Sequence, residues 1–285
     1  MTLHDDNGLF RNARRVYRAS GAALIFVLFF IPIAYAVMIS LESGTHFLNH
    51  PLVPQAVPTF QNFSAAWSQG DLGPELLNTI LYSFVAAGIS TALSVLLAFP
   101  ISRALIKGSS ALYRSFVIGI CLPLPIIPLF VESRMLHLFD NRLGYIILHV
   151  EVGIPLGVLL LGAFIGSIPK ELDEAAWLDG AGYLKYLAKI IVPLAWPSII
   201  IIFLYSMLGV WNDIIGPIVF LATPSLFPVT RGVYNFYGTN QSEAPLLAAA
   251  VVIVSLPVVA LFVMSQRQLL RSAMGSGVRA RPNEL

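Results

Sequence analysis

Two carboxylates stand inside long apolar stretches, where an ionisable side chain needs a partner or a cavity. Asp213 directly follows Trp211 and Asn212, and Glu151 lies near one end of another apolar run. A charge in the hydrocarbon of a bilayer is costly, so such residues usually face a bundle interior, a water-filled path or a partner group. These carboxylates could relay protons or contact a solute. Alternatively, Asn212 and Asp213 could bond across helices or hold a broken helix end near Gly216-Pro217.

Motifs for other chemistry are missing from the sequence. It contains no GxxxxGK[ST] loop for nucleotide phosphates, no HExxH, no GxSxG and no His or Cys pairs at metal-ligand spacing. The single cysteine, Cys121, excludes an internal disulfide and is interpreted as a packing residue. The five histidines are scattered: His4, His46, His50, His137 and His149. We therefore expect neither an ATPase nor a membrane enzyme, and no cofactor or metal in this chain.

The most charged internal stretch is 169–197, which lies between the uncharged segments 152–168 and 198–212. Its charged residues are Lys170, Glu171, Asp173, Glu174, Asp179, Lys185 and Lys189. Pro169 suits a first helical turn, and the acidic residues after it lie near the positive end of a helix dipole. Gly180 and Gly182 interrupt the helix, since glycine enters left-handed conformations without a side-chain clash. The pattern predicts two short helices around a bend, and periodicity alone also fits helices that merely lie on the bilayer.

The composition is that of a membrane protein. Of 285 residues 57% are apolar and only 11% charged, and the mean hydropathy is +0.79. Soluble domains have about a quarter of their residues charged. The backbone N–H and C=O groups of an apolar segment in a bilayer must bond to each other, because no water is present there. These apolar runs are therefore predicted to be helices. We expect an all-α, polytopic membrane protein with six transmembrane helices.

The expected helices follow from a length of about 20 residues per crossing. They cover residues 19–41, 76–100, 115–131, 143–167, 198–222 and 244–266. The first run is too long for a cleaved signal peptide. Pro123, Pro125 and Pro128 should kink or locally unwind the third span. The chain thus divides into a tail (1–18), a transmembrane domain (19–266) that contains the 169–197 loop, and a second tail (267–285).

The distribution of Lys and Arg predicts the orientation. One set of connections and tails (1–18, 101–114, 169–197 and 267–285) holds 14 of the 17 basic residues. The positive-inside rule therefore places both termini and the 169–197 loop in the cytoplasm.

The 169–197 loop resembles the EAA motif of permease subunits of bacterial ABC importers. The matching residues are Glu174, Ala175, Ala176, Asp179, Gly180, Ala181, Ile190 and Pro193, with Leu194 and Pro197. The form with Asp179 directly before Gly180 resembles the carbohydrate-importer branch of the family, as in the maltose-type permeases. Leu187 and Val192 depart from the Phe and Leu that the family often has, but both are apolar. The final Gly277-Val278-Arg279 departs from the family's usual Gly-Ala-Val-Lys.

The resemblance implies a type I importer permease fold in the bacterial inner membrane, with the 169–197 loop as a cytoplasmic coupling helix that docks on an ATPase. It implies several partners: a second permease subunit in a heterodimer, two ATPase subunits that bind ATP and Mg, an external solute-binding protein and membrane lipid. No nucleic-acid partner is expected. The small alanines would allow close approach to the ATPase, and Glu174 would offer an acceptor to a basic donor.

The resemblance also implies a solute, which is a sugar, oligosaccharide or polyol moved inward. Trp211, Asn212 and Asp213 resemble a motif of the carbohydrate permeases, in which an aromatic ring could stack on a sugar and polar groups could bond its hydroxyls. We favour the structural role for Asn212 and Asp213, because a partner permease can carry most solute contacts. For Glu151 we also favour a structural role over contact with the solute.

Other functions remain open from the sequence. Glycerophosphate or polyamine import is possible within the class, although glycerophosphate would call for cationic groups deep in the path. An ion-coupled secondary transporter could use Glu151 or Asp213 as a proton relay. It would leave the 169–197 loop without a role.

Overall fold

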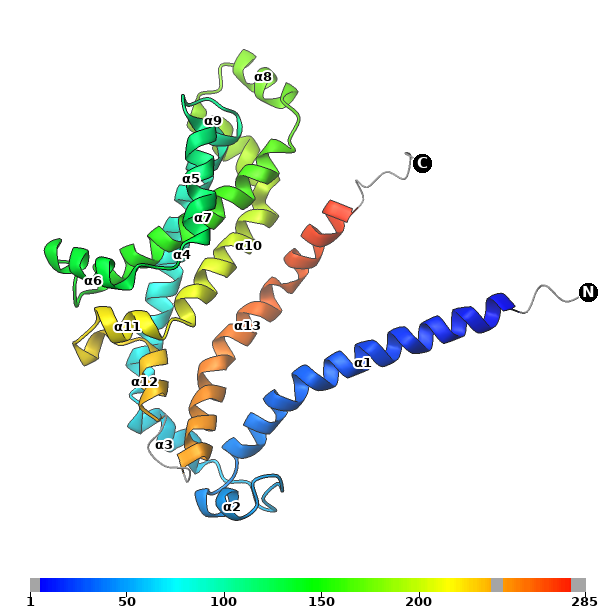
Figure 1. Cartoon of the computed structure of the whole chain (residues 1–285), viewed down its shortest axis with the longest axis vertical. Coiled ribbons are helices and arrows are strands. Elements are labelled where there is room, and N and C mark those ends of the chain that lie inside the picture. Colours follow the sequence, from blue (N-terminus) through cyan, green and yellow to red (C-terminus); the bar gives the residue numbers. More distant parts are fainter. Residues whose placement is uncertain (1–5, 237–242, 278–285) are drawn as a thin grey trace, which may run out of the picture. The chain divides into compact units, whose positions relative to one another are not determined.

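The computed structural model describes residues 6–236 and 243–277, and within these ranges the regular structure is entirely helical (Figure 1). Among the described residues, five helices are long and apolar enough to cross a membrane, and a bent helix pair makes a sixth candidate. The predicted tails fall partly outside the described residues. Where they are described, helix α1 (Asp6–Ser40) runs through the first tail and α13 (Ala244–Gly277) through much of the second. The chain forms two compact units, 1–70 with 235–255 and 71–234 with 256–285.

The first unit contains α1, whose apolar part is Ser20–Ser40, the short helices α2 (Gly44–Asn49) and α3 (Gln61–Gln69), and the start of α13. The end of α1 is closed by Asn62, whose Nδ2 donates to the carbonyl oxygens of Ser40 (2.9 Å) and Glu42 (2.7 Å). The Ser40 carbonyl is among the last of α1, which lack partners within the helix, and Glu42 lies in the turn that follows. A side chain from α3 therefore holds the turn between α1 and α2.

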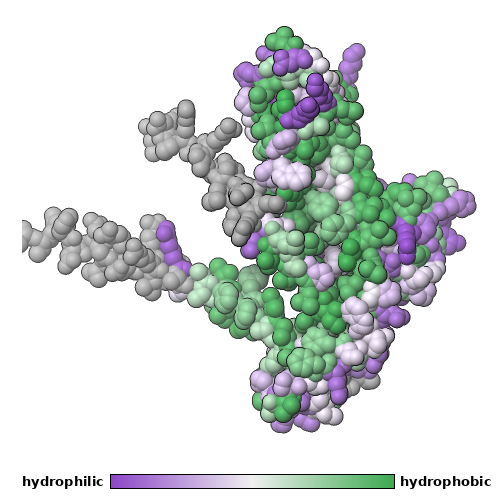
Figure 2. All heavy atoms as spheres, turned by 180° about the vertical axis from the view of Figure 1, so that it is seen from behind, coloured by the Kyte–Doolittle hydropathy of each residue, from purple (hydrophilic) through white to green (hydrophobic). Residues whose placement is uncertain are grey.

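The second unit is built on three long helices, α4 (Leu72–Ser102), α7 (Arg142–Gly166) and α10 (Val192–Trp211). Small residues let α4 and α7 approach closely, as is typical of membrane helices. A Cβ atom added to Gly157 of α7 would lie 2.7 Å from Ser94 Cβ of α4. Figure 2 shows hydrophobic side chains along the middle of this unit, and hydrophilic ones among hydrophobic ones at its α8 end and on the part that projects to the side.

Gly157→Ala should lower the thermal stability of the purified permease, because the added methyl group overpacks the α4–α7 contact at a cost of about 1–3 kcal/mol. Gly162→Ala is the matched control on the same helix, since its nearest neighbour, Tyr113, would lie 3.9 Å away. Unfolding midpoints in detergent measure the difference. Equal midpoints for the two variants would contradict the close packing.

The third predicted span is broken at its prolines. Helix α5 (Ser109–Cys121) and helix α6 (Ile126–Met135) meet at 111° across residues 122–125. The predicted kink is confirmed. The angle is so large that α5 and α6 are two separate helices rather than one bent helix.

The fifth predicted span, 198–222, differs from the structure at both ends. Helix begins at Tyr183 with α9 (Tyr183–Tyr186), passes through a π-helical turn η1 (Leu187–Ile191) and continues as α10 to Trp211. Pro193 does not end the helix. It lies in the first turn after η1, and the wider π-helical turn before it accommodates a residue that has no backbone N–H to donate. Short elements follow Trp211: α11 (Ile215–Phe220), η2 (Pro224–Leu226) and α12 (Val229–Asn235).

Asp140 joins the connection before α7 to the one after α11. Its Oδ1 accepts hydrogen bonds from the backbone N–H groups of Ala222 (2.7 Å) and Thr223 (2.8 Å), and its Oδ2 accepts from the Thr223 hydroxyl (2.6 Å). The backbone N–H of Asp140 donates to the Phe220 carbonyl. Asp140 has a left-handed backbone (φ 54°), a conformation that Asp tolerates better than most residues.

These hydrogen bonds lower the pKa of Asp140 below its ordinary value. A carboxyl with a depressed folded-state pKa stabilises the fold above its unfolded value, about 3.9, and this stabilisation is lost as the pH falls through the folded value. Asp140→Asn should therefore flatten the loss of stability below about pH 4. Unfolding midpoints from pH 6 to pH 3 test this. Parallel profiles for wild type and variant would contradict it.

Candidate coupling and solute sites

Helix α8 (Glu171–Leu178) ends in a Schellman motif. Gly180 has φ +70°, its N–H donates to the Trp177 carbonyl (3.0 Å), and the N–H of Ala181 donates to the Ala176 carbonyl (2.9 Å). The predicted pair of helices around a bend is confirmed, with Gly180 in the left-handed conformation. The same expectation for Gly182 was wrong: its φ is −69°, since it is the extended residue that precedes α9.

The residues of the EAA-like motif divide between two faces. Ala176 is buried in the core that α4, α7 and η1 share, and Ala181 and Ile190 pack against that core. The other five motif residues are exposed: Glu174, Ala175, Asp179, Gly180 and Pro193. Beside them Trp177 and Leu178 are 59% and 89% exposed. Helix α8 therefore carries an exposed acidic and apolar surface.

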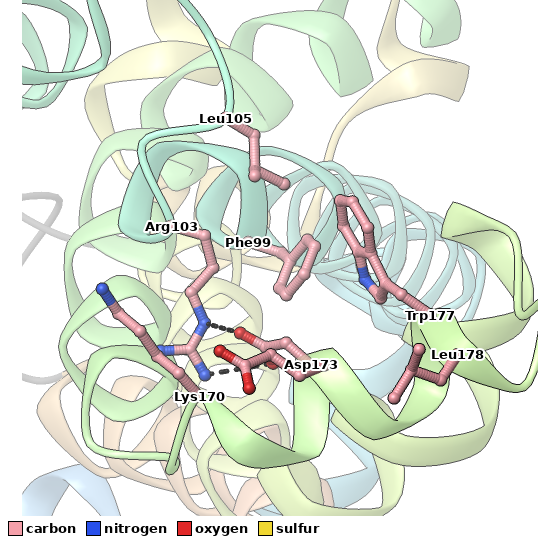
Figure 3. A pocket seen from close by; sticks show the side chains of 8 residues that line it. Phe99, Arg103, Leu105, Lys170, Asp173, Trp177 and Leu178 are labelled. Carbon is pink, nitrogen blue, oxygen red and sulfur yellow. Dashed lines mark hydrogen bonds and ion pairs between the residues drawn. The ribbon is translucent and has the colours of Figure 1, made fainter.

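A groove of about 610 Å³ separates α8 from the end of α4 (Figure 3). Its lining residues are Phe99, Arg103, Leu105, Lys170, Asp173, Glu174, Trp177 and Leu178. Figure 3 shows the rings of Phe99 and Trp177 on one side of it and the Arg103–Asp173 pair on the other. The groove combines an apolar wall with charged residues that belong to both elements.

Arg103 and Asp173 tie α8 to α4. Arg103 Nε lies 2.7 Å from Asp173 Oδ2, and Arg103 Nη2 donates to Asp173 Oδ1 at 3.3 Å and to the Ile168 carbonyl at 2.9 Å. Tyr186 of α9 donates its hydroxyl to the same carboxylate. In the sequence Arg103 is recognisable only as one of several basic residues near a span end, and Asp173 only as an acidic residue near a helix N-terminus.

Asp213 occupies the break between α10 and α11. Its Oδ1 accepts from the N–H of Gly216 (2.9 Å), its Oδ2 accepts from the Tyr145 hydroxyl (2.9 Å), and His149 Nε2 lies 3.2 Å from that oxygen. The Asp213 carbonyl accepts from the Thr230 hydroxyl. Asp213 thus holds the broken helix and bonds to α7. Tyr145 and His149 were not predicted, because nothing local in the sequence joins positions more than sixty residues apart.

A cavity of about 620 Å³ lies beside Asp213. His149, Tyr205, Ser206 and Asn212 provide its other polar lining, among largely apolar neighbours. The structure thus brings Asn212 and Asp213 to one cavity. Asn212 Nδ2 donates only along its own helix, to the Leu208 carbonyl.

The two other residues that sequence analysis proposed for the path lie elsewhere. Trp211 is only 2% exposed and does not line the Asp213 cavity. Glu151 is exposed and lines a separate cavity of about 80 Å³, together with Glu132 and Ser133. The four residues therefore do not form a single site.

Long apolar helices packed through small residues, with an amphipathic helix at one end, define a multi-pass membrane protein. Residues 90–273 match the model of the binding-protein-dependent transport system inner membrane component, which covers most of the chain, and the chain belongs to that family. It is 30% identical to the melibiose/raffinose/stachyose import permease protein MelC of Bacillus subtilis, over 90% of this chain and 94% of that protein. It is 26% identical to the diacetylchitobiose uptake system permease protein NgcG of Streptomyces coelicolor, over 90% and 87%.

A solved structure has the same fold. It is a bacterial ABC transporter involved in the import of the acidic polysaccharide alginate, with a TM-score of 0.79 and 22% identity over 94% of this chain and 98% of that one. A second structure of a bacterial alginate ABC transporter is in complex with a periplasmic protein that carries an alginate pentasaccharide; its TM-score is 0.62 at 19% identity, over 92% and 98%. These likenesses confirm the predicted permease fold.

Proposed function

We propose that this chain is one of two permease subunits of an ATP-driven importer that moves an uncharged sugar, oligosaccharide or polyol into a bacterial cell. The observation that carries the proposal is α8, which is fixed to the bundle through Ala176 and Asp173 while Glu174, Trp177 and Leu178 are exposed. Such a helix can pass a movement made outside the membrane to the spans. The permease itself is not an enzyme.

The exposed face of α8 is the proposed dock of a cytoplasmic ATPase. Since the sequence lacks a phosphate-binding loop, ATP and Mg would bind to two ATPase subunits. The excess of Lys and Arg in the segments at this end supports a cytoplasmic position for α8 and both termini, by the positive-inside rule. The other partners in the proposal are a second, different permease, an external solute-binding protein and the surrounding lipid.

The cavity beside Asp213 supports an uncharged solute. Among the described residues, its lining contains no Lys or Arg, and Asp213 already faces His149 and the Tyr145 hydroxyl. A glycerophosphate would need cationic groups, and a polyamine would need a free carboxylate. Asn212, Tyr205 and Ser206 instead offer the neutral donors and acceptors that suit hydroxyl groups. The melibiose, raffinose, stachyose and diacetylchitobiose in the names of the two sequence relatives are uncharged, whereas the alginate of the structural neighbours is acidic.

Two experiments test the proposal. The chain, expressed with its genomic neighbours, should co-purify with two ATPase subunits and a second permease. The external binding protein from the same set should bind neutral saccharides in a calorimetric screen that includes putrescine and glycerol 3-phosphate. Preference for either charged ligand would refute the solute class. Solute uptake by this chain alone on an ion gradient would refute the importer.

A further inference from the structure

The end of α4 and both arms of the α8–α9 bend are joined by one largely buried polar cluster. Arg103 is the C-cap residue that follows α4, and its side chain is only 5% exposed; that of Asp173 is 16% exposed. The guanidinium donates one hydrogen bond to the carboxylate, from Nη2 to Oδ1 at 3.3 Å, and its Nε forms an ion pair with Oδ2 at 2.7 Å. Because the guanidinium is planar, these two contacts restrict the orientation of Asp173 as well as its distance. Figure 3 shows the pair bridging the two elements.

The same cluster reaches two further elements. Arg103 also bonds the Ile168 carbonyl, which follows the end of α7. Tyr186 of α9 donates to Asp173, and its ring lies 5.3 Å from that of Phe99 on α4. Tyr183 of α9 donates to the Leu96 carbonyl of α4 at 2.6 Å. Any displacement of the bend therefore acts first on the last turns of α4.

Stability alone does not account for the pair. A buried ion pair is often no more stabilising than apolar side chains of similar volume, because both charges lose their hydration. The surrounding core is already rich in apolar contacts from Phe99, Ala176, Tyr186 and Leu187. What the ion pair adds is a directional link between α8 and a span.

We infer that Arg103 is a positioning residue that makes α8 and α4 move as one body, so that a nucleotide-driven displacement of α8 reaches the transmembrane core. Helix α4 is well placed to receive it, because it packs on both α7 and α10. The inference rests on the proposed docking of an ATPase at α8. It adds the path by which the docked helix drives the spans.

The test measures the distance between spin labels on α8 and α4 in the assembled transporter, with and without ATP and vanadate. Labels replace Leu172 of α8 and Leu93 of α4, which are both exposed, in a background with Cys121→Ser. In the otherwise unchanged protein the distance should be the same in both nucleotide states. Arg103→Gln should make it change with nucleotide. The ratio of solute uptake to ATP hydrolysis should fall roughly tenfold, within the range of typical coupling free energies.

Lys170→Gln is the matched control, since it removes an exposed cation from the same groove. Its distances should equal those of the parent. If Arg103→Gln does not accumulate, Arg103→Lys and Tyr186→Phe each remove part of the cluster while keeping the packing, and both should introduce a nucleotide dependence. Exchange of the two charges, Arg103→Asp with Asp173→Arg, should reduce the nucleotide dependence of the distance again.

A single distance that is independent of nucleotide in every Arg103 and Tyr186 variant would overturn the inference. A purely structural role would lower the yield of transporter and leave the distances alone, which would overturn it as well. A different result would refute the docking proposal. In that case the ATPases would remain bound to the permease when the exposed face of α8 is altered.

Discussion

Gly180→Pro should abolish solute uptake while the permease remains in the membrane. Proline fixes φ near −65°, whereas Gly180 has φ +70°, and the substitution also removes the N–H that donates to the Trp177 carbonyl. The C-terminal turn of α8 would open, and the exposed Glu174, Trp177 and Leu178 would leave their positions relative to the bundle. Because the spans themselves are untouched, the variant should be inserted normally and its ATPases should hydrolyse ATP without import.

The local backbone provides a graded series for this prediction. Gly180→Ala has open space around its Cβ, so only the left-handed backbone opposes it, at a cost of roughly 1–2 kcal/mol. Gly182→Ala is the control, because Gly182 has an ordinary φ of −69° and the same open space. Uptake into proteoliposomes that contain the full transporter should fall in the order Gly182→Ala, Gly180→Ala, Gly180→Pro. Normal solute-stimulated turnover in Gly180→Pro would remove α8 from the mechanism.

What the sequence predicted well is governed by local rules. Span positions follow from apolar length, the α8 bend follows from glycine, and the broken third span follows from Pro123, Pro125 and Pro128. Each depends on a few neighbouring residues and on the need to satisfy backbone hydrogen bonds in a bilayer. The same rules misplaced the start of the fifth span. The predicted span starts at residue 198, after Pro193 and Pro197, whereas the helix runs through both prolines from the π-helical turn η1.

What could not be predicted depends on contacts between distant positions. Arg103 meets Asp173, seventy residues later, and Asp213 meets Tyr145 and His149 of α7. A charge pattern places Arg103 at a membrane boundary and says nothing of its partner. Ala175 and Ala176 likewise belong to one motif, but only Ala176 packs in the core. Which face of α8 is exposed is set by the bundle against which it lies.

Asp213→Ala should destabilise the permease more than any change at a neighbouring cavity residue. The substitution leaves three groups without their partner: the N–H of Gly216, the hydroxyl of Tyr145 and the ring of His149. A buried polar group that loses its partner costs about 1–3 kcal/mol. Asp213→Asn keeps an acceptor for Gly216 and an amide towards α7, so it should recover much of the unfolding midpoint in detergent.

Asn212→Ala separates the structural role of Asp213 from solute binding. Asn212 lines the same cavity but bonds only to the Leu208 carbonyl of its own helix, so its removal should leave the unfolding midpoint unchanged. If the cavity receives the solute, the loss of one hydrogen bond of about 1 kcal/mol should raise the half-saturating concentration for uptake roughly fivefold. Uptake kinetics of Asn212→Ala and Asp213→Asn, compared at equal transporter density, decide the matter. Unchanged kinetics in both variants would show that this break in the helix serves the fold, and that the solute passes along surfaces supplied by the second permease.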